Sequence, residues 1–423
     1  MKLSDNSSVS RFNSLKIAVF SSSAPFGRGE SFVVSEVNAI AKRNVQVLIV
    51  PTILRKGSPN RFVFRENVSV VSIPLLSLSS IFELIALIFG RFTDFADLLM
   101  FAKAGSLRNT LKNILVIPKA VLLSKLLRRE SVEHIHAHWL TTPSTMALMV
   151  SHLSGIPWSC TGHRGDIVAN NGLEQKFESA GFVRFISKSG FALGCKLAPL
   201  NRSNAVILHM GVSIDSDARN YGEAPETHGK VKIFCPANLV PVKGHEYLLI
   251  ALSKMNFRNQ VLLEIVGEGE RKSELEKLVS DLNIQSQVNF RGHLANKELL
   301  NIYASGQADI VVLPSRDLGG GVHEGIPVSL MEAMAYKIPV ISTKTGGIPE
   351  LLEDGAGERY GVLVDADNSG ELAASLDWLV SSADERQALG SKGFDRVYAE
   401  FNQEIIAEHL IQLIRKHQGS SSL

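Results

Sequence analysis

Cysteine is rare in this sequence, because the 423 residues contain only Cys160, Cys195 and Cys235. They are scattered without disulfide or metal-site spacing, so we expect reduced thiols, as in a cytosolic protein. An excess of one charge is also lacking, since 44 basic residues face 42 acidic ones. This balance does not favour nucleic acid as a partner.

Long hydrophobic runs are missing as well. A membrane-spanning helix needs about 20 consecutive apolar residues, whereas the longest candidate, 81–89, is interrupted by Glu83 and followed by Arg91. Residues 1–14 are polar and rich in serine and asparagine, so they predict a disordered tail and no signal peptide. We therefore predict a cytoplasmic protein, with membrane contact limited to the periphery of the inner face.

The sequence does contain enough apolar material for large cores, at 45% hydrophobic residues. Its pattern predicts βαβ units of a parallel sheet. In the first, LKIAVF at 15–20 is a strand, 31–43 a helix and 45–50 the next strand. The loop between strand and helix lacks GxGxxG, so a dinucleotide fingerprint is absent. A second unit runs from a strand at 310–313, through three consecutive glycines, to a helix at 328–335.

Two carboxylates in this second unit predict a ligand. Glu324 lies in the loop before the helix, and Glu332 lies within its apolar sequence. Burying an ionised carboxylate is costly unless a partner is present, and a vicinal diol is one such partner. The free N–H groups around Gly325 and Ile326, at the positive helix end, form an anion site. A ligand with phosphate and ribose fits this set, while a glutamate salt-bridged to a neighbouring lysine remains the alternative.

The surrounding residues resemble the signature of the retaining glycosyltransferases of family 4. The matching residues are Glu324-Gly325-Ile326-Pro327, Glu332-Ala333-Met334-Ala335 and Gly346-Gly347-Ile348-Pro349-Glu350. The resemblance implies the α/β fold called GT-B, with two Rossmann-like domains whose parallel sheets face each other across a cleft. It also implies that Glu324 holds hydroxyls of the donor sugar, that Glu332 holds the nucleotide ribose, and that Gly325, Ile326 and Pro327 bind the donor.

N-terminal motifs resemble the same family. Gly27, Gly29 and Glu30 belong to a loop that the resemblance places near the sugar and diphosphate, with Glu30 on the acceptor side. Helix capping is the alternative for Glu30. His138 ends the phrase HAHW, which resembles the strand end on the acceptor side. The alternating histidines of this strand could suggest zinc, but we disfavour it, because no carboxylate or cysteine completes a ligand set nearby.

His163 resembles the histidine that contacts the donor sugar at the family's reaction centre, and Asp166 resembles the aspartate that follows on the acceptor side. The family usually has His-Gly-x-Asp, whereas this chain has His163-Arg164-Gly165-Asp166. A histidine that caps the next helix is the alternative for His163.

In the second half, Lys243 matches the family's lysine at the donor diphosphate, and Asn238 replaces the usual arginine. Arg291, Arg316 and Lys344 are candidates to supply the missing charge. Gly267 and Glu268 resemble the turn beside the nucleotide.

These resemblances imply five segments. They are a tail at 1–14, an acceptor domain at 15–212, a linker at 213–229, a nucleotide-sugar donor domain at 230–393, and a helix at 394–418 that crosses back to the first domain.

The implied activity is retaining, metal-independent hexosyl transfer from a UDP- or GDP-linked sugar to a saccharide or lipid-linked acceptor, as in bacterial exopolysaccharide synthesis of the colanic-acid type. His163, Lys243 and Glu324 are the predicted catalytic residues, and no cofactor or metal is expected. A nucleotide-sugar epimerase of the same fold, or a non-catalytic partner of another transferase, are the alternatives.

Residues 81–130 are the least standard segment and predict two or three amphipathic helices. Basic residues lie among their leucines and isoleucines, namely Lys112, Lys119, Lys125, Arg128 and Arg129. One interpretation is a surface that sits on an anionic membrane beside a lipid-linked acceptor. We favour the other, in which ordinary helices face the core and expose their charges.

Overall fold

The computed structural model describes residues 14–26, 30–55, 63–214, 229–319 and 323–418. Gly27 and Gly29, and nearly all of the predicted tail and linker, lie outside the described residues. The chain divides into two compact units. Unit 1 contains residues 1–184, 197–206 and 407–423, and unit 2 contains residues 185–196 and 207–406. Each unit is described by itself.

The first sheet is built around β1 (Lys16–Ser21), which pairs in parallel with β2 (Gln46–Pro51) on one side and β4 (His134–His138) on the other. Its described strands follow the order β3-β2-β1-β4-β5-β6-β7. Ile17, Val19 and Phe20 are almost completely buried, as expected of a parallel strand covered on both faces. The remaining strands are β3 (Val68–Val70), β5 (Trp158–Gly162), β6 (Phe182–Phe185) and β7 (Ala205–Ile207).

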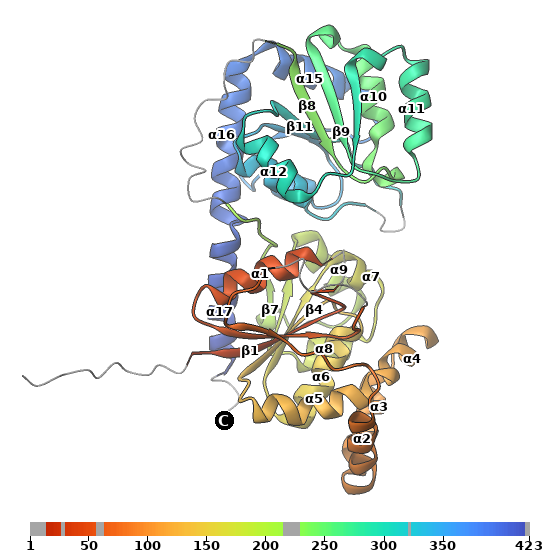
Figure 1. Cartoon of the computed structure of the whole chain (residues 1–423), viewed down its shortest axis with the longest axis vertical. Helices are drawn as coiled ribbons and strands as arrows, with labels where there is room; N and C mark the ends of the chain where they lie inside the picture. Colours follow the sequence, from red (N-terminus) through yellow and green to blue (C-terminus); the bar gives the residue numbers. More distant parts are fainter. Residues whose placement is uncertain (1–13, 27–29, 56–62, 215–228, 320–322, 419–423) are drawn as a thin grey trace, which may run out of the picture. The chain divides into compact units, whose positions relative to one another are not determined.

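Helices lie on both sides of this sheet (Figure 1). The segment predicted to contain two or three helices forms four, α2 (Leu78–Gly90), α3 (Phe92–Ala102), α4 (Leu107–Leu115) and α5 (Ile117–Arg129). Pro118 starts α5 at a position where its missing N–H is harmless. The other helices of unit 1 are α1 (Ser31–Ala41), α6 (Thr142–Ser154), α7 (Arg164–Val168) and α8 (Leu173–Ser179). Helix α9 (Lys188–Leu197) belongs to unit 2 except for its last residue.

The second sheet has the described strand order β10-β9-β8-β11-β12-β13 and is parallel throughout. The strands are β8 (Val231–Pro236), β9 (Val261–Val266), β10 (Val288–Gly292), β11 (Ile310–Leu313), β12 (Val340–Thr343) and β13 (Val362–Val364). Ile233 and Cys235 enter one core cluster, whereas Phe234 enters the cluster on the opposite face. Apolar residues therefore bury this sheet on both sides, and the strand predicted at 310–313 is confirmed.

The helices of unit 2 flank this sheet (Figure 1). They are α10 (His245–Lys254), α11 (Lys272–Asp281), α12 (Asn296–Ala304), α13 (Val328–Ala335), α14 (Ile348–Leu352), α15 (Ser369–Ser381) and α16 (Ala383–Glu400).

The single helix predicted at 394–418 is wrong in one respect, because α16 ends at Glu400 and α17 (Gln403–Gln418) starts a new helix. Val212 causes the break. Its N–H donates to the carbonyl of Phe401 at 2.9 Å, and its carbonyl accepts from the N–H of Gln403 at 3.0 Å. The Asn402 side chain then accepts from the N–H of Glu404 at 2.9 Å. A strand-like pairing with a distant segment thus replaces helical hydrogen bonds, and the helical sequence pattern does not display it.

Among the described residues, none of the helices combines the length and the apolar character that a membrane crossing requires.

Both sheets reverse their strand order at one point, between β1 and β4 in the first and between β8 and β11 in the second. In open α/β sheets, ligands bind beyond the carboxyl ends of the strands at this point. The loops that follow these four strands carry most of the predicted site residues.

Candidate active site

Lys243 and Glu324 meet in unit 2. Lys243 follows β8, Glu324 precedes α13, and Nζ of the lysine is 2.5 Å from Oε1 of the glutamate. The two side chains are only 20% and 14% exposed. Glu324 therefore forms a salt bridge with a lysine, which is the alternative to ligand binding that the sequence also allows. A ligand with phosphate for the lysine and hydroxyls for the carboxylate could satisfy both charges.

Glycine in the second part of the motif fixes the Glu324 backbone. Gly346 has φ +57°, and a Cβ atom there would lie 1.9 Å from the carbonyl oxygen of Glu324. The N–H of Gly347 donates to the same oxygen at 3.3 Å, and Nδ1 of His323 lies 2.8 Å from it. Only glycine allows this backbone-to-backbone approach. The Gly-Gly pair thus supports the loop that carries the carboxylate.

A second glycine contact joins the turn after β9 to the loop after β8. Gly267 has φ +149°, and a Cβ atom there would lie 2.1 Å from the carbonyl oxygen of Ala237. The N–H of Leu239 donates to the carbonyl of Glu268 at 3.0 Å. The structure therefore brings Asn238, Gly267 and Glu268 together, as expected of one binding surface, with Asn238 and Glu268 exposed.

Glu332 lies on α13 and is partly buried. Its Oε1 accepts a hydrogen bond from Nδ2 of Asn296 at 2.8 Å, and no cation pairs with it among the described residues. Burial raises its pKa, and the Asn296 amide opposes that rise. The nearby Tyr303 hydroxyl is buried without a partner, and burial together with Glu332 raises its pKa. This carboxylate retains acceptor capacity for hydroxyl donors.

The three cations considered as substitutes for the missing arginine already have carboxylate partners. The pairs are Arg291 with Glu264 at 2.8 Å, Arg316 with Asp367 at 2.6 Å and with Glu246 at 3.1 Å, and Lys344 with Asp365 at 2.9 Å. Lys243 is thus the cation that the structure places beside Glu324.

In unit 1, His138 and His163 come together because they end or follow neighbouring strands, β4 and β5. Nδ1 of His138 is 3.4 Å from Nε2 of His163. The rings of Phe32 and Trp139 lie 5.0 and 4.3 Å from the His163 ring, centre to centre. Burial lowers the pKa of His163 well below its usual range, so this imidazole is neutral at pH 7. His163 precedes α7, but its side chain makes no capping hydrogen bond, so the capping alternative is wrong.

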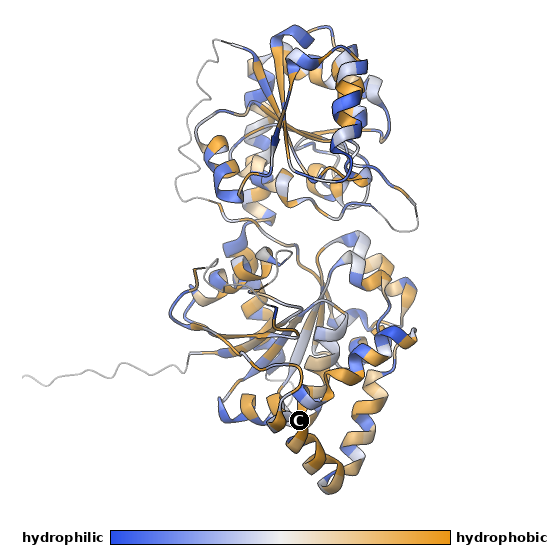
Figure 2. Cartoon of the chain, turned by 45° about the vertical axis from the view of Figure 1, so that its right-hand side comes forward, coloured by the Kyte–Doolittle hydropathy of each residue, from blue (hydrophilic) through white to orange (hydrophobic). Residues whose placement is uncertain are grey.

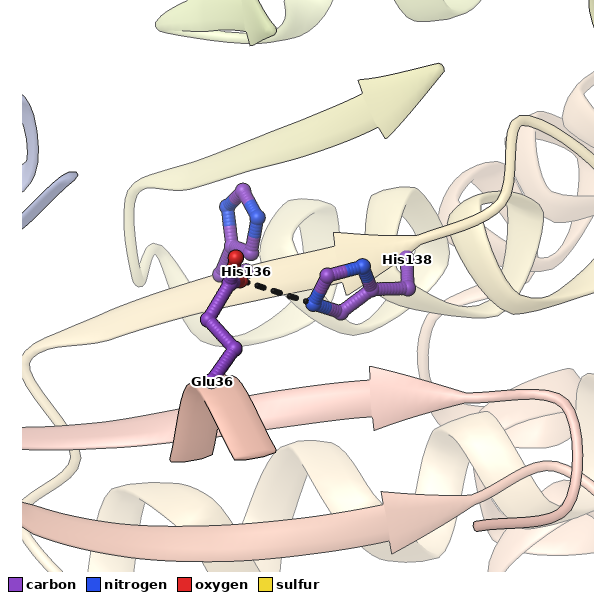
Figure 3. Close-up of side chains that lie close together, drawn as sticks. All are labelled: Glu36, His136 and His138. Carbon is purple, nitrogen blue, oxygen red and sulfur yellow. Dashed lines mark ion pairs between the residues drawn. The ribbon is translucent and has the colours of Figure 1, made fainter. Parts of the chain in front are cut away.

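Glu36 extends this histidine pair into the interior. Its Oε1 lies 3.1 Å from Nε2 of His138 (Figure 3). Its Oε2 lies 2.8 Å from Nη1 of Arg184. All of these side chains are at most 1% exposed. Burial opposes ionisation of Glu36, but Arg184 and His138 outweigh it and hold the pKa well below its usual range.

Sequence reasoning missed Glu36 and Arg184, since their partners are distant in the chain. One signal was available, because Glu36 is an acid within the apolar stripe of α1. That stripe contains Phe32, Val33, Val37 and Ile40.

The three side chains in Figure 3 bring one ligand atom each within 4.8 Å of one another. The expectation that no carboxylate accompanies these histidines is therefore wrong. Both ring nitrogens of His136 are occupied, however, at 2.8 Å from the Ser159 hydroxyl and 2.9 Å from the Thr161 hydroxyl. The Arg184 guanidinium also lies beside Glu36. A second cation there would face that charge, so these contacts fit a hydrogen-bond network better than a metal site.

Two acids on the predicted acceptor side hold the surrounding backbone. Glu30 accepts from the N–H of Ser22 at 3.0 Å, from the N–H of Ser23 at 2.6 Å and from Nε1 of Trp139 at 2.7 Å. It makes no side-chain cap on α1, so helix capping is wrong for Glu30. Asp166 accepts from the N–H of Leu140 at 2.5 Å, and burial raises its pKa to about 7. Both carboxylates position the loops around His138 and His163.

This architecture is the GT-B fold, as predicted. The structure superposes on Anabaena HepE, which was solved in complex with UDP, with a TM-score of 0.68 and 15% identity. The match covers 95% of this chain and 100% of HepE. Likeness at this level of identity concerns the fold alone.

Sequence comparison points to one family. Residues 219–396 match the family described as "Glycosyl transferases group 1". The GDP-mannose-dependent monoacylated alpha-(1-6)-phosphatidylinositol monomannoside mannosyltransferase of Corynebacterium glutamicum is 33% identical over 185 residues, 43% of this chain and 46% of that protein. The amylovoran biosynthesis glycosyltransferase AmsK of Erwinia amylovora is 29% identical over 229 residues, 53% of each chain. The matches thus span about half the length of these relatives, and they confirm the family predicted from the motif.

Proposed function

We propose that the protein is a glycosyltransferase that moves a sugar from a nucleotide-linked donor to a carbohydrate or lipid-linked acceptor. The observation that carries this proposal is the contact between Lys243 and Glu324, at 2.5 Å, beside the strand-order reversal of the second sheet. It places a cation suited to a leaving diphosphate next to a carboxylate suited to sugar hydroxyls. The family match over residues 219–396 supports the same assignment.

The proposed reaction is a front-face displacement that retains the configuration at the anomeric carbon. The bond from this carbon to the donor phosphate oxygen breaks, and a bond to the acceptor oxygen forms on the same face. The departing phosphate takes the acceptor's proton. Lys243 and the N–H groups at the start of α13 stabilise the charge that develops on the diphosphate. Glu324 holds sugar hydroxyls and Glu332 holds the ribose. The proposal assigns charge neutralisation to these groups instead of a metal ion.

The histidine pair has a defined task in this proposal. We assign the ring hydrogen of His138 to Nε2, which lies 3.1 Å from Oε1 of Glu36, so that Nδ1 of His138 is an acceptor. Nε2 of His163 then donates to that nitrogen across 3.4 Å. Nδ1 of His163 is left as an acceptor for a sugar hydroxyl. Glu36 and His138 are thus positioning residues that set the tautomer of His163.

Both UDP- and GDP-linked donors agree with relatives, since HepE was solved with UDP and the C. glutamicum enzyme is named for GDP-mannose. A thermal-shift panel of nucleoside diphosphates and their sugars identifies the base. The resemblance to AmsK, an amylovoran biosynthesis protein, supports a role in exopolysaccharide synthesis.

The decisive experiment follows radiolabelled donor into crude acceptor extract. We expect Lys243→Ala and Glu324→Ala to lower transfer by about a hundredfold or more, as for the loss of a charge-stabilising group. Lys254→Ala, at an exposed position of α10, is the matched control. Near-normal rates in folded Lys243 and Glu324 variants would remove the site assignment.

The same assay separates the alternatives. Isomerisation of the donor without acceptor would indicate an epimerase, and donor binding without turnover would indicate a non-catalytic partner. Transfer that persists in a chelator supports the metal-independent mechanism, whereas loss restored by a divalent cation contradicts it.

A further inference from the structure

Helix α4 turns its apolar side outward. Leu107, Leu111, Ile114 and Leu115 share one helical face and are 76%, 53%, 39% and 50% exposed. The buried side chain on the other face is the polar Asn113, whose Nδ2 donates to the Ala102 carbonyl at 3.1 Å and to Oδ1 of Asn171 at 2.7 Å. A helix of a soluble domain normally buries its apolar stripe. The reversed orientation of α4 therefore marks an interaction surface.

Helices α2 and α3 continue this exposed apolar surface. On α2, Leu78, Phe82, Ile85 and Phe89 recur at helical spacing on one side and are all exposed. Phe92, Leu99 and Met100 are exposed on α3. Of the 22 large hydrophobic side chains exposed in the described chain, 13 lie between Leu76 and Leu115, so this is a concentrated patch and not scattered surface residues. Figure 2 colours α2 and α3 mainly as hydrophobic.

We call this patch, formed by α2, α3 and α4, the α2–α4 face. Our favoured expectation of ordinary core-facing helices is wrong for these three helices. The apolar side of α5 does face the core, since Ala120, Leu123 and Leu127 are buried. Its Lys119 departs from the expected exposed charges, because it is completely buried and donates to the carbonyls of Pro51 and Ile73 at 2.7 Å each.

The charges around the α2–α4 face are mainly positive. When the buried Lys119 is left out, seven basic and three acidic residues lie between Leu78 and Arg129, a net charge of +4 in a chain whose total is +2. Each of the three acids already has a partner, since Glu83 pairs with Lys125, Asp94 with Arg91, and Asp97 with His152. Arg108 and Lys112 are exposed on α4 and make no ion pair within the described part of the chain. The partner of this face should therefore be both apolar and anionic.

We propose that the α2–α4 face docks on an anionic lipid bilayer, with its apolar side chains in the interfacial region and Arg108 and Lys112 at the headgroups. Apolar insertion combined with basic residues is the usual chemistry of peripheral helices. A second copy of this chain fits less well. A two-fold symmetric contact through this face would bring the same positive residues of both copies together. The proposal does not depend on the transferase activity.

Sedimentation of the full chain with lipid vesicles tests this proposal. We expect binding to vesicles of phosphatidylcholine mixed with phosphatidylglycerol, and weaker binding to phosphatidylcholine alone. Each basic residue near an anionic surface contributes a factor of about five. Arg108→Gln with Lys112→Gln should therefore reduce partitioning by about 25-fold, and added salt should weaken the wild-type protein similarly.

A second variant tests the apolar part. Phe82→Ser with Phe89→Ser removes two side chains that are 70% and 87% exposed, so folding should be unaffected while partitioning falls at least tenfold. Trp378→Ser, at a residue 42% exposed on α15, and Lys254→Gln with Lys277→Gln, on exposed positions of unit 2, are matched controls. An equal loss of vesicle partitioning in the control variants would overturn the proposal, as would no binding of the wild-type protein to anionic vesicles. So would a dimer in sedimentation equilibrium that the phenylalanine variant abolishes.

Discussion

Replacing Glu36 with glutamine tests whether the buried network of unit 1 depends on charge. Glutamine keeps the shape and one oxygen acceptor but removes the negative charge beside Arg184, whose side chain is completely buried. Removing one partner of a buried ion pair typically costs about 3–5 kcal/mol. This is a large part of the usual free energy of unfolding of a domain, about 5–15 kcal/mol. For a unit of this size, the melting temperature should fall by roughly 6–20 °C.

The assay can be confined to unit 1. The chain has three tryptophans, of which Trp139 and Trp158 lie in unit 1 and Trp378 in unit 2. In a Trp378→Phe background, urea unfolding followed by tryptophan fluorescence therefore reports on unit 1. Glu408→Gln is the matched control, because Glu408 pairs with Arg43 at 2.9 Å in the same unit but is 46% exposed. Exposed pairs contribute about 0–1 kcal/mol.

Two further measurements complete this test. Adding Arg184→Met to Glu36→Gln should restore part of the lost stability, because it also removes the buried positive charge that Glu36 faces. The pKa of Glu36 is depressed in the folded state, so its charge stabilises the fold above the unfolded-state pKa of about 4.3. This stabilisation is lost as the pH falls below that value towards the folded pKa. The difference in the free energy of unfolding between wild type and Glu36→Gln should therefore become smaller as the pH is lowered. Equal unfolding free energies of Glu36→Gln and Glu408→Gln at pH 7 would refute the argument.

Two other predictions concern single side chains. Glu332→Ala should raise the Michaelis constant for the donor and leave the turnover number nearly unchanged, because it removes ribose binding and not leaving-group stabilisation; an unchanged constant would make Glu332 merely structural. Burial lowers the pKa of His134 to about 3. Between this pH and about pH 6.5, only the unfolded state binds a proton at His134, so the free energy of unfolding should fall by about 1.4 kcal/mol for each unit by which the pH is lowered. His134→Asn should remove that contribution from the acid dependence of urea unfolding, and an unaltered slope would contradict it.

The sequence predicted correctly those structural features that depend only on residues close together in the chain. Three features follow from apolar runs, glycines and proline close together. They are the strand at 310–313, the helix after Pro327, and the placement of Glu324 before this helix and Glu332 within it. The motif from Glu324 to Glu350 likewise indicated the family and the GT-B fold. These features need little information about distant residues, because local backbone preferences and sheet burial produce them.

The tertiary structure decided which distant residues meet. It paired Glu324 with Lys243, joined Glu36 to His138 and Arg184, and broke the last helix through Val212. It also turned the apolar side of α4 outward, although an amphipathic sequence reads the same whether its stripe faces a core or a membrane. Periodicity specifies that a helix has two unlike faces, and only the packing of the other elements decides which face is covered.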